Sequence, residues 1–131
     1  MFIDASALTA MLANEVDGPE LIARMERYKR LTTSPVAVWE TSVALARLAR
    51  KSIADARGSL ERFLELAGIE ILAVPPEAAA LALDAFERYG KGRHPAQLNM
   101  GDCFAYACAR HLGEPLMFKG GDFPLTDIEP A

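Results

Sequence analysis

The chain has 131 residues, of which 51% are hydrophobic and 24% are charged, and its formal net charge is -4. This length suits one compact domain, so we expect a single domain over residues 1–131. The apolar content is too high and the net charge too small for a disordered protein. No apolar run reaches the roughly 18 residues of a membrane-spanning helix. No basic segment precedes Asp4, which disfavours a secretory signal and predicts a cytoplasmic protein that needs no membrane.

Short apolar runs alternate with helical patterns along the whole chain, which is typical of an α/β domain with a mostly parallel sheet. The runs predict strands at 2–4, 31–34, 69–74 and 116–118, with a short fifth strand near Ile128. The helical patterns fall at 5–14, 18–30, 35–48, 52–67 and 76–90, and a loop over 90–101 leads into a last helix from Asp102.

Two helix ends and the two cysteines have specific sequence signals. Ser34 is a good N-cap before Pro35 at the first helical position, and Gly68 is expected to end the helix that precedes it. The segment after Asp102 is apolar on every side, which predicts a buried helix. Cys103 and Cys108 would lie about 8 Å apart in that helix, too far for a disulfide, and are expected to be buried free thiols.

Three aspartates occupy comparable places in this pattern. Asp4 follows the first strand, Asp102 opens the buried helix, and Asp122 follows the fourth strand. The carboxyl ends of parallel strands meet at one edge of the sheet, so these side chains could converge there. Glu40 is a fourth candidate because it lies on the inward edge of its helix. Each aspartate alone could also serve only as a helix cap or a turn residue.

Four carboxylates in one place would repel one another unless some were protonated or a divalent cation neutralised them. Oxygen ligands favour Mg²⁺ or Mn²⁺. Zinc is disfavoured because His94 and His111 have no ligand spacing with the cysteines. One or two hard cations suit the hydrolysis of a phosphodiester by in-line attack.

Weaker candidates surround the acidic set. Ser6 could bond to Asp4 or support the metal site, or could only bond the backbone of its own helical turn. Asn99 could support the site or merely order the loop before Asp102. Lys91, Arg93 and His94 make that loop basic. A solvated loop is the common meaning of such a run, and guidance of a nucleic-acid backbone is the second reading.

The sequence resembles the PIN-domain family, and within it the VapC-type toxins of bacterial toxin–antitoxin pairs. The resemblance covers essentially the whole chain and depends on the order and spacing of five short motifs. These motifs are residues 2–7 (FIDASA), 34–40 (SPVAVWE), 91–96 (KGRHPA), 98–107 (LNMGDCFAYA) and 118–123 (FKGGDF).

The resemblance implies a three-layer α/β/α sandwich and an Mg²⁺- or Mn²⁺-dependent endoribonuclease. The family's acidic positions fall on Asp4, Glu40, Asp102 and Asp122, and its small hydroxyl residue near the metal falls on Ser6. Relatives often carry Asn or Asp where this chain has Gly121, which makes Asp122 the least secure of the four; Asp127 is a weaker substitute. The resemblance also implies a homodimer and a cognate antitoxin that blocks the pocket. Helices at 5–30 and 35–67 could supply that surface or could only face the core.

We therefore hypothesise cleavage of single-stranded RNA that leaves a 5′-phosphate and a 3′-hydroxyl. Two other classes of protein remain open. The first is a receiver-like or phosphatase-like fold with a phosphorylated aspartate, in which Lys119 and Thr126 would take part. The second is a non-catalytic module that keeps the fold and uses its surface to bind a partner.

Overall fold

A computed structural model describes all residues 1–131, and a four-stranded parallel sheet lies at its centre. The strands are β1 (Phe2–Ile3), β2 (Leu31–Thr33), β3 (Ile69–Ile71) and β4 (Leu116–Met117), in the spatial order β3-β2-β1-β4. Phe2 pairs with both Thr32 and Leu116, so β1 lies in the middle of the sheet. The helices are α1 (Ala5–Leu12), α2 (Gly18–Met25), α3 (Pro35–Ala49), α4 (Ile53–Ala67), α5 (Ala78–Tyr89) and α6 (Met100–Leu112), and a 3-10 turn covers Phe123–Leu125.

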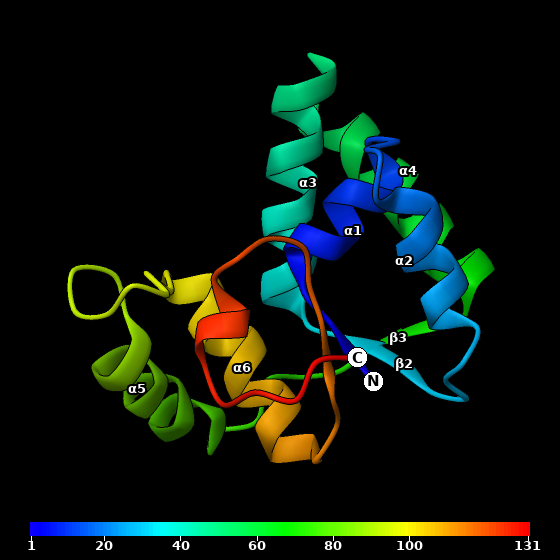
Figure 1. The fold of residues 1–131 in the computed structure, drawn as a ribbon. Helices are drawn as coiled ribbons and strands as arrows, with labels where there is room; N and C mark the ends of the chain where they lie inside the picture. The colour runs from blue at the N-terminus through cyan, green and yellow to red at the C-terminus, as the bar shows by residue number, and fades with distance from the viewer.

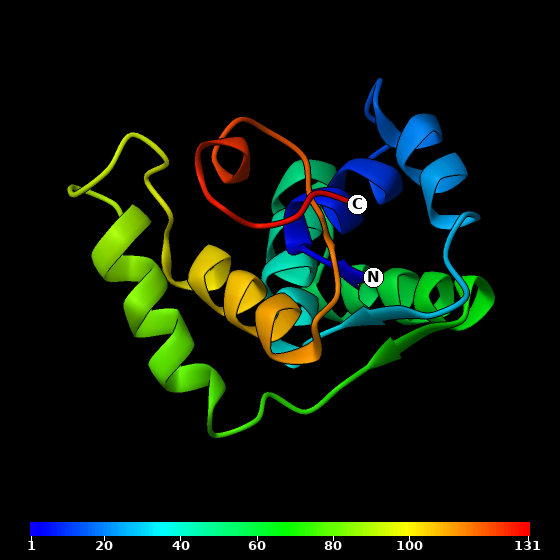
Figure 2. The same cartoon turned by 60° about the horizontal axis from the view of Figure 1, so that its bottom comes forward.

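Helices cover both faces of the sheet, which makes the fold the expected three-layer α/β sandwich (Figures 1 and 2). Successive strand residues point to opposite faces. Phe2 and Leu116 accordingly belong to the core beneath α5 and α6, whereas Ile3 and Met117 belong to the core shared with α1, α2 and α4. All four side chains are fully buried. These very short strands are thus held by packing on both faces as much as by their own hydrogen bonds.

Most predicted elements are present, and their ends differ from the sequence expectation. The helices expected to run to residues 14 and 30 end at Leu12 and Met25, the third strand stops at Ile71, and α5 begins at Ala78. The expected fifth strand is a single bridge between Leu116 and Pro130. Ser34 caps α3 by accepting a hydrogen bond from the Ala37 amide, and Gly68 ends α4 with a φ of 66°.

The start of α6 is a correction to the sequence expectation. The helix begins at Met100, and Asn99 rather than Asp102 is its N-cap. Asp102 stands three positions further on and completes a capping box: its carboxylate accepts from the Asn99 amide, and the Asn99 side chain accepts from the Asp102 amide. The helix is buried as expected, and both cysteines are buried free thiols. None of the helices has the length and apolar composition needed to cross a membrane.

Candidate metal centre

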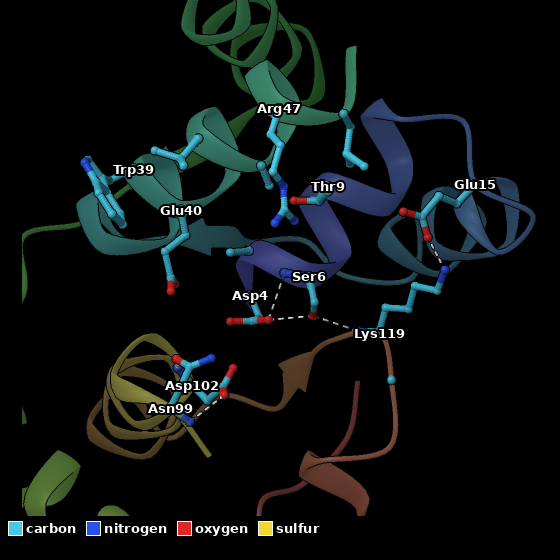
Figure 3. A pocket seen from close by; sticks show the side chains of 15 residues that line it. Asp4, Ser6, Thr9, Glu15, Trp39, Glu40, Arg47, Asn99, Asp102 and Lys119 are labelled. Carbon is cyan, nitrogen blue, oxygen red and sulfur yellow. Dashed lines mark hydrogen bonds and ion pairs between the residues drawn. The ribbon is translucent and has the colours of Figure 1, made fainter. Parts of the chain in front are cut away.

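A cleft of about 720 Å³ opens at the carboxyl ends of β1 and β4, between α1, α3 and the start of α6 (Figure 3). Three of the four acidic residues that the sequence singled out line this cleft, namely Asp4, Glu40 and Asp102. Ser6 and Asn99, the two supporting candidates, line it as well. The parallel sheet therefore brings together side chains that are up to 98 positions apart in the sequence.

Asp4 is the most deeply buried member of the site, with 2% of its surface exposed. It follows β1 directly and caps α1, and its Oδ2 accepts hydrogen bonds from the Ser6 amide at 2.9 Å and the Ser6 hydroxyl at 2.5 Å. Burial raises the pKa of Asp4, and the hydrogen bonds from Ser6 and Ala5 only partly oppose this effect. A buried carboxylate with a raised pKa is a group that a bound cation would stabilise.

Ser6 connects Asp4 to the segment that follows β4. While its hydroxyl donates to Asp4, the same oxygen accepts a hydrogen bond from the Lys119 amide at 3.0 Å (Figure 3). The Lys119 side chain in turn pairs with Glu15 and with Asp17 beyond α1. The hydroxyl of Ser6 therefore fixes the position of Asp4 relative to two elements that are far apart in sequence.

Asp102 enters the cleft from the first turn of α6, where the capping box holds its Oδ2 against the Asn99 amide at 2.8 Å. Burial and, to a smaller extent, the negative charges of Asp4 and Asp122 together raise its pKa to about 6, against the opposing effect of the hydrogen bond from Asn99. The Asp102 carboxylate thus has a hydrogen-bond partner, and neighbouring carboxylates also repel it.

Glu40 reaches the cleft from α3, and its carboxylate lies directly on the backbone of α6 at Gly101. A Cβ added to Gly101 would lie 2.1 Å from both carboxylate oxygens, so this approach requires a glycine. Burial, followed by the charges of Asp4 and Asp102, raises the pKa of Glu40 to about 7. The three carboxylates therefore interact as one electrostatic group.

Asp122 does not line the cleft and its side chain is exposed. Its charge nevertheless contributes, as the smallest of the causes, to the raised pKa of Asp102. Asp127, the weaker substitute, is bonded to other residues. Burial raises its pKa, but hydrogen bonds from Tyr106 and Arg88 outweigh that effect and hold the pKa at about 2. It ties the C-terminal segment to α5 and α6.

The basic loop residues Lys91, Arg93 and His94 lie outside the lining of the cleft. Arg93 pairs with Glu87 at 2.8 Å, and the Nδ1 atom of His94 accepts from the Ala96 amide at 3.1 Å. In Figure 1 their loop projects beyond the end of α5, away from α1. The structure therefore does not bring these three residues to the carboxylates.

Several cleft residues were not among the sequence candidates for the metal site. Trp39 and Arg47 stand on α3 on either side of Glu40, and Thr9, Glu15 and Lys119 complete the polar lining (Figure 3). The signal for Arg47 was present, because a residue seven positions after Glu40 lies two turns along the same helix face. In the sequence Trp39 belongs to the 34–40 motif, and nothing there separates it from the other apolar residues of the same helix.

The donor set fits a hard divalent cation. No three acidic, histidine or cysteine side chains converge closely enough to ligate one ion directly. Mg²⁺, however, keeps several of its waters and is usually held by only one or two carboxylates. Asp4 and Asp102 could bind such an ion directly while Glu40 contacts its hydration shell. Burial raises the pKa of all three carboxylates, and repulsion from neighbouring carboxylates adds to this effect for Glu40 and Asp102, so a bound cation would stabilise their ionised forms.

Comparison with known proteins identifies the family of this chain. The model of the PIN domain family matches residues 1–129, and the chain belongs to that family. It is 41% identical over 128 residues to a VapC ribonuclease of Mycobacterium bovis, covering 98% of this chain and 95% of that protein. It is 38% identical over 139 residues to a VapC ribonuclease of Rhizobium meliloti, covering 97% and 98% of the two chains.

A solved structure has the same fold. The crystal structure of VapC20 of Mycobacterium tuberculosis, described as a sarcin–ricin loop cleaving toxin, superposes with a TM-score of 0.76 and covers 99% of this chain and 97% of its own. The two sequences are 16% identical. The similarity to this structure confirms the three-layer architecture, whereas the PIN assignment depends on the sequence relatives.

Proposed function

We propose that this protein is a metal-dependent endoribonuclease that cleaves single-stranded RNA and acts as the toxin of a toxin–antitoxin pair. The observation that carries the proposal is the buried Asp4, which shares one cleft with Glu40 and Asp102. The names of the VapC relatives support the choice of RNA as substrate. The products expected from attack by water are a 5′-phosphate and a 3′-hydroxyl.

Each acidic residue has a distinct role in this proposal. Asp4 and Asp102 hold Mg²⁺ or Mn²⁺, which when bound neutralises the phosphate and lowers the pKa of water. Glu40, with a pKa near 7, is suited to accept the proton of the attacking water at a carboxylate oxygen. Asp122 contributes negative charge from outside the lining of the cleft, and Ser6 orients Asp4. Lys91, Arg93 and His94 would contact only RNA that extends well beyond the cleft.

The receiver-like alternative has little support in the geometry. Lys119 is paired with Glu15 and Asp17 on the far side of Ser6, and the Thr126 hydroxyl donates to the Phe123 carbonyl. Neither group is free to act beside Asp4. A non-catalytic PIN-fold module is distinguished from the nuclease only by an activity measurement.

The same family assignment supports a proposal about the partners of the protein. We include a cognate antitoxin, which would cover the cleft, and a homodimer in the proposal. An apolar depression of about 350 Å³ between α5 and α6 supports the homodimer, because Leu83 is 70% and Met100 66% exposed there. No membrane is needed for either partner, and a cytoplasmic location suits an RNA substrate.

The test uses the purified chain, free of partners, with total RNA and Mg²⁺, Mn²⁺ or EDTA. We expect discrete fragments with either metal and none with EDTA. The Asp4→Asn and Asp102→Asn variants should give none, and Asp122→Asn should retain part of the activity. Glu65→Gln, on the exposed side of α4, is the matched control and should cleave like the parent. Cleavage by Asp102→Asn at the parent's rate, or intact RNA with every metal, would contradict the proposal.

A further inference from the structure

The side of α3 that faces the cleft carries more than Glu40. Trp39 is 65% exposed, and Val43 and Leu48 on the same side are 38% and 54% exposed. The face of α3 that packs into the protein contains Leu45 and several smaller residues, such as Ala37 and Thr41. The largest apolar side chain of the helix thus lies in solvent at the cleft, where its exposure has no role in stabilising the fold.

Trp39 and Arg47 are both without partners inside the molecule. The indole of Trp39 stacks on no aromatic ring or cation, since the aromatic pairs of the structure involve only Tyr, Phe and His and its cation–π contacts involve only Tyr and Phe rings. The cleft contains one other cation, Lys119, which is neutralised by Glu15 and Asp17. Arg47 has no ion pair, although its side chain extends from α3 into the cleft toward Thr9 (Figure 3).

The positions of these two side chains suit a strand that passes the carboxylates. They are eight residues apart on α3, which corresponds to roughly 12 Å along the helix axis, and Glu40 lies between them in sequence. An aromatic face is a stacking platform for an unpaired base, and an unneutralised guanidinium binds a backbone phosphate. A double helix would not expose a base for Trp39, so the arrangement favours a single strand.

We propose that the cleft-facing side of α3 is a track for single-stranded RNA, on which the Trp39 indole stacks on one base and Arg47 binds a backbone phosphate on the other side of Glu40. This inference depends on the proposed ribonuclease function and adds to it how the strand is held. Trp39 is a binding residue here and takes no part in bond cleavage. A stacked base is read by its surface rather than by its edge, so Trp39 contributes affinity with little sequence preference.

Trp39 is the only tryptophan of the chain, so its fluorescence reports stacking directly. The probe is an RNA of about 12 nucleotides that spans a cleavage site mapped in total RNA, bound to the inactive Asp102→Asn chain. We expect the RNA to quench the emission. Replacing each nucleotide in turn by an abasic one should reveal one position at which the quenching disappears and binding weakens by about 10- to 100-fold.

Cleavage by otherwise intact chains gives an independent measure. Trp39→Ala should raise KM by about 10- to 100-fold with a smaller change in kcat, and Trp39→Phe should recover most of the loss. Leu66→Ala is the matched control, because Leu66 is 79% exposed on α4. Arg47→Gln should reduce the slope of the logarithm of the binding constant against the logarithm of the salt concentration by about one, which corresponds to one phosphate contact. Arg62→Gln on α4 should leave this slope unchanged.

The outcomes separate this inference from the proposed function. RNA that the parent chain leaves uncut with every metal overturns the ribonuclease proposal. RNA that the parent and Trp39→Ala cut with equal KM, or emission that no abasic position alters, overturns only the α3 track. Emission that changes on binding the antitoxin and not on binding RNA would assign the exposed side of α3 to the protein partner instead.

Discussion

The absence of a Cβ at Gly101 allows the Glu40 carboxylate to lie against the backbone of α6. Gly101 has ordinary helical backbone, so no left-handed conformation requires glycine there, and yet a Cβ would overlap the Glu40 carboxylate. The clash involves the end of a flexible side chain, which can swing aside. Alanine at this position would therefore affect the geometry of the site and not the fold.

We expect Gly101→Ala to fold normally, because alanine favours a helix over glycine by up to about 1 kcal/mol. Cleavage should fall by about 100-fold, the size of effect that a displacement of about 1 Å in a catalytic group can cause. Thermal unfolding and kcat/KM measure the two effects separately.

Gly58→Ala on α4 is the matched control, since nothing lies within 4 Å of a Cβ there. This variant should gain stability by up to about 1 kcal/mol and cleave like the parent. Parental activity in Gly101→Ala would show that the contact between Glu40 and α6 is not needed for catalysis.

At the scale of elements, Ser6 is the point where α1 meets the segment after β4. Removing its hydroxyl leaves the Lys119 amide without an acceptor and removes one of the hydrogen bonds that lower the pKa of Asp4. Ser6→Ala should therefore cost about 1–2 kcal/mol of stability. The higher pKa of Asp4 should also move the acidic limb of the pH–rate profile to higher pH.

Urea unfolding and the pH dependence of kcat/KM test both expectations for Ser6→Ala. Ser59→Ala provides the control, because the Ser59 hydroxyl donates only to the Asp55 carbonyl within exposed α4. If Ser6→Ala lost stability and kept the parental pH profile, Ser6 would be a structural link without influence on Asp4.

The order of elements and the buried carboxylates were predictable from the sequence because both follow from local signals. Short apolar runs predicted all four strands, and in a parallel sheet the residues that follow the strands, among them Asp4, lie at the same edge as the start of the Asp102 helix. Helix ends were less predictable, since α1 gives way to a turn in which Asn14 has a φ of 53°. An N-cap at Asn99 and one at Asp102 also give nearly the same sequence signal.

The parts of the site that sequence could not locate depend on side-chain direction. The sequence left open whether the apolar residues of α3 face the core or form a surface for a partner. In the structure its buried face includes Thr41 and Leu45, and Trp39 lies outside. Lys91 and Arg93 are close to Asp102 in sequence, and yet their loop is folded back by the pairing of Gly90 with Leu98. Asp122 follows two glycines, whose conformational freedom leaves its direction undetermined by local sequence.

At the scale of the whole molecule, the acidic cleft makes stability depend on pH and on metal. The pKa of Glu40 rises from 4.5 to about 7 on folding and that of Asp102 from 3.8 to about 6. Between about pH 4 and 7 the folded chain therefore binds more protons than the unfolded chain, and its free energy of unfolding falls as the pH rises. Asp127 acts in the opposite direction with a pKa near 2, and its contribution is constant above about pH 5.

We therefore expect the metal-free protein to lose thermal stability between pH 5 and 8, and Mg²⁺ to restore more of it at pH 8 than at pH 5. The cation binds the ionised carboxylates of the folded state, so it stabilises that state by mass action. Glu40→Gln removes one titrating group and its repulsion with Asp4 and Asp102. This variant should be more stable than the parent at pH 8 without metal and should gain less from Mg²⁺.

Calorimetric melting of the parent, Glu40→Gln and the surface control Glu65→Gln, each with Mg²⁺ or EDTA, measures this coupling without any RNA. All other titrating groups are common to the three chains, so differences among their pH profiles isolate the cleft. If Glu40→Gln and Glu65→Gln changed the profile equally, the carboxylates would not be coupled in the folded state. A stability that Mg²⁺ leaves unchanged at pH 8 would instead show that the cleft is no cation site, because a ligand that binds only the folded chain must raise its melting temperature.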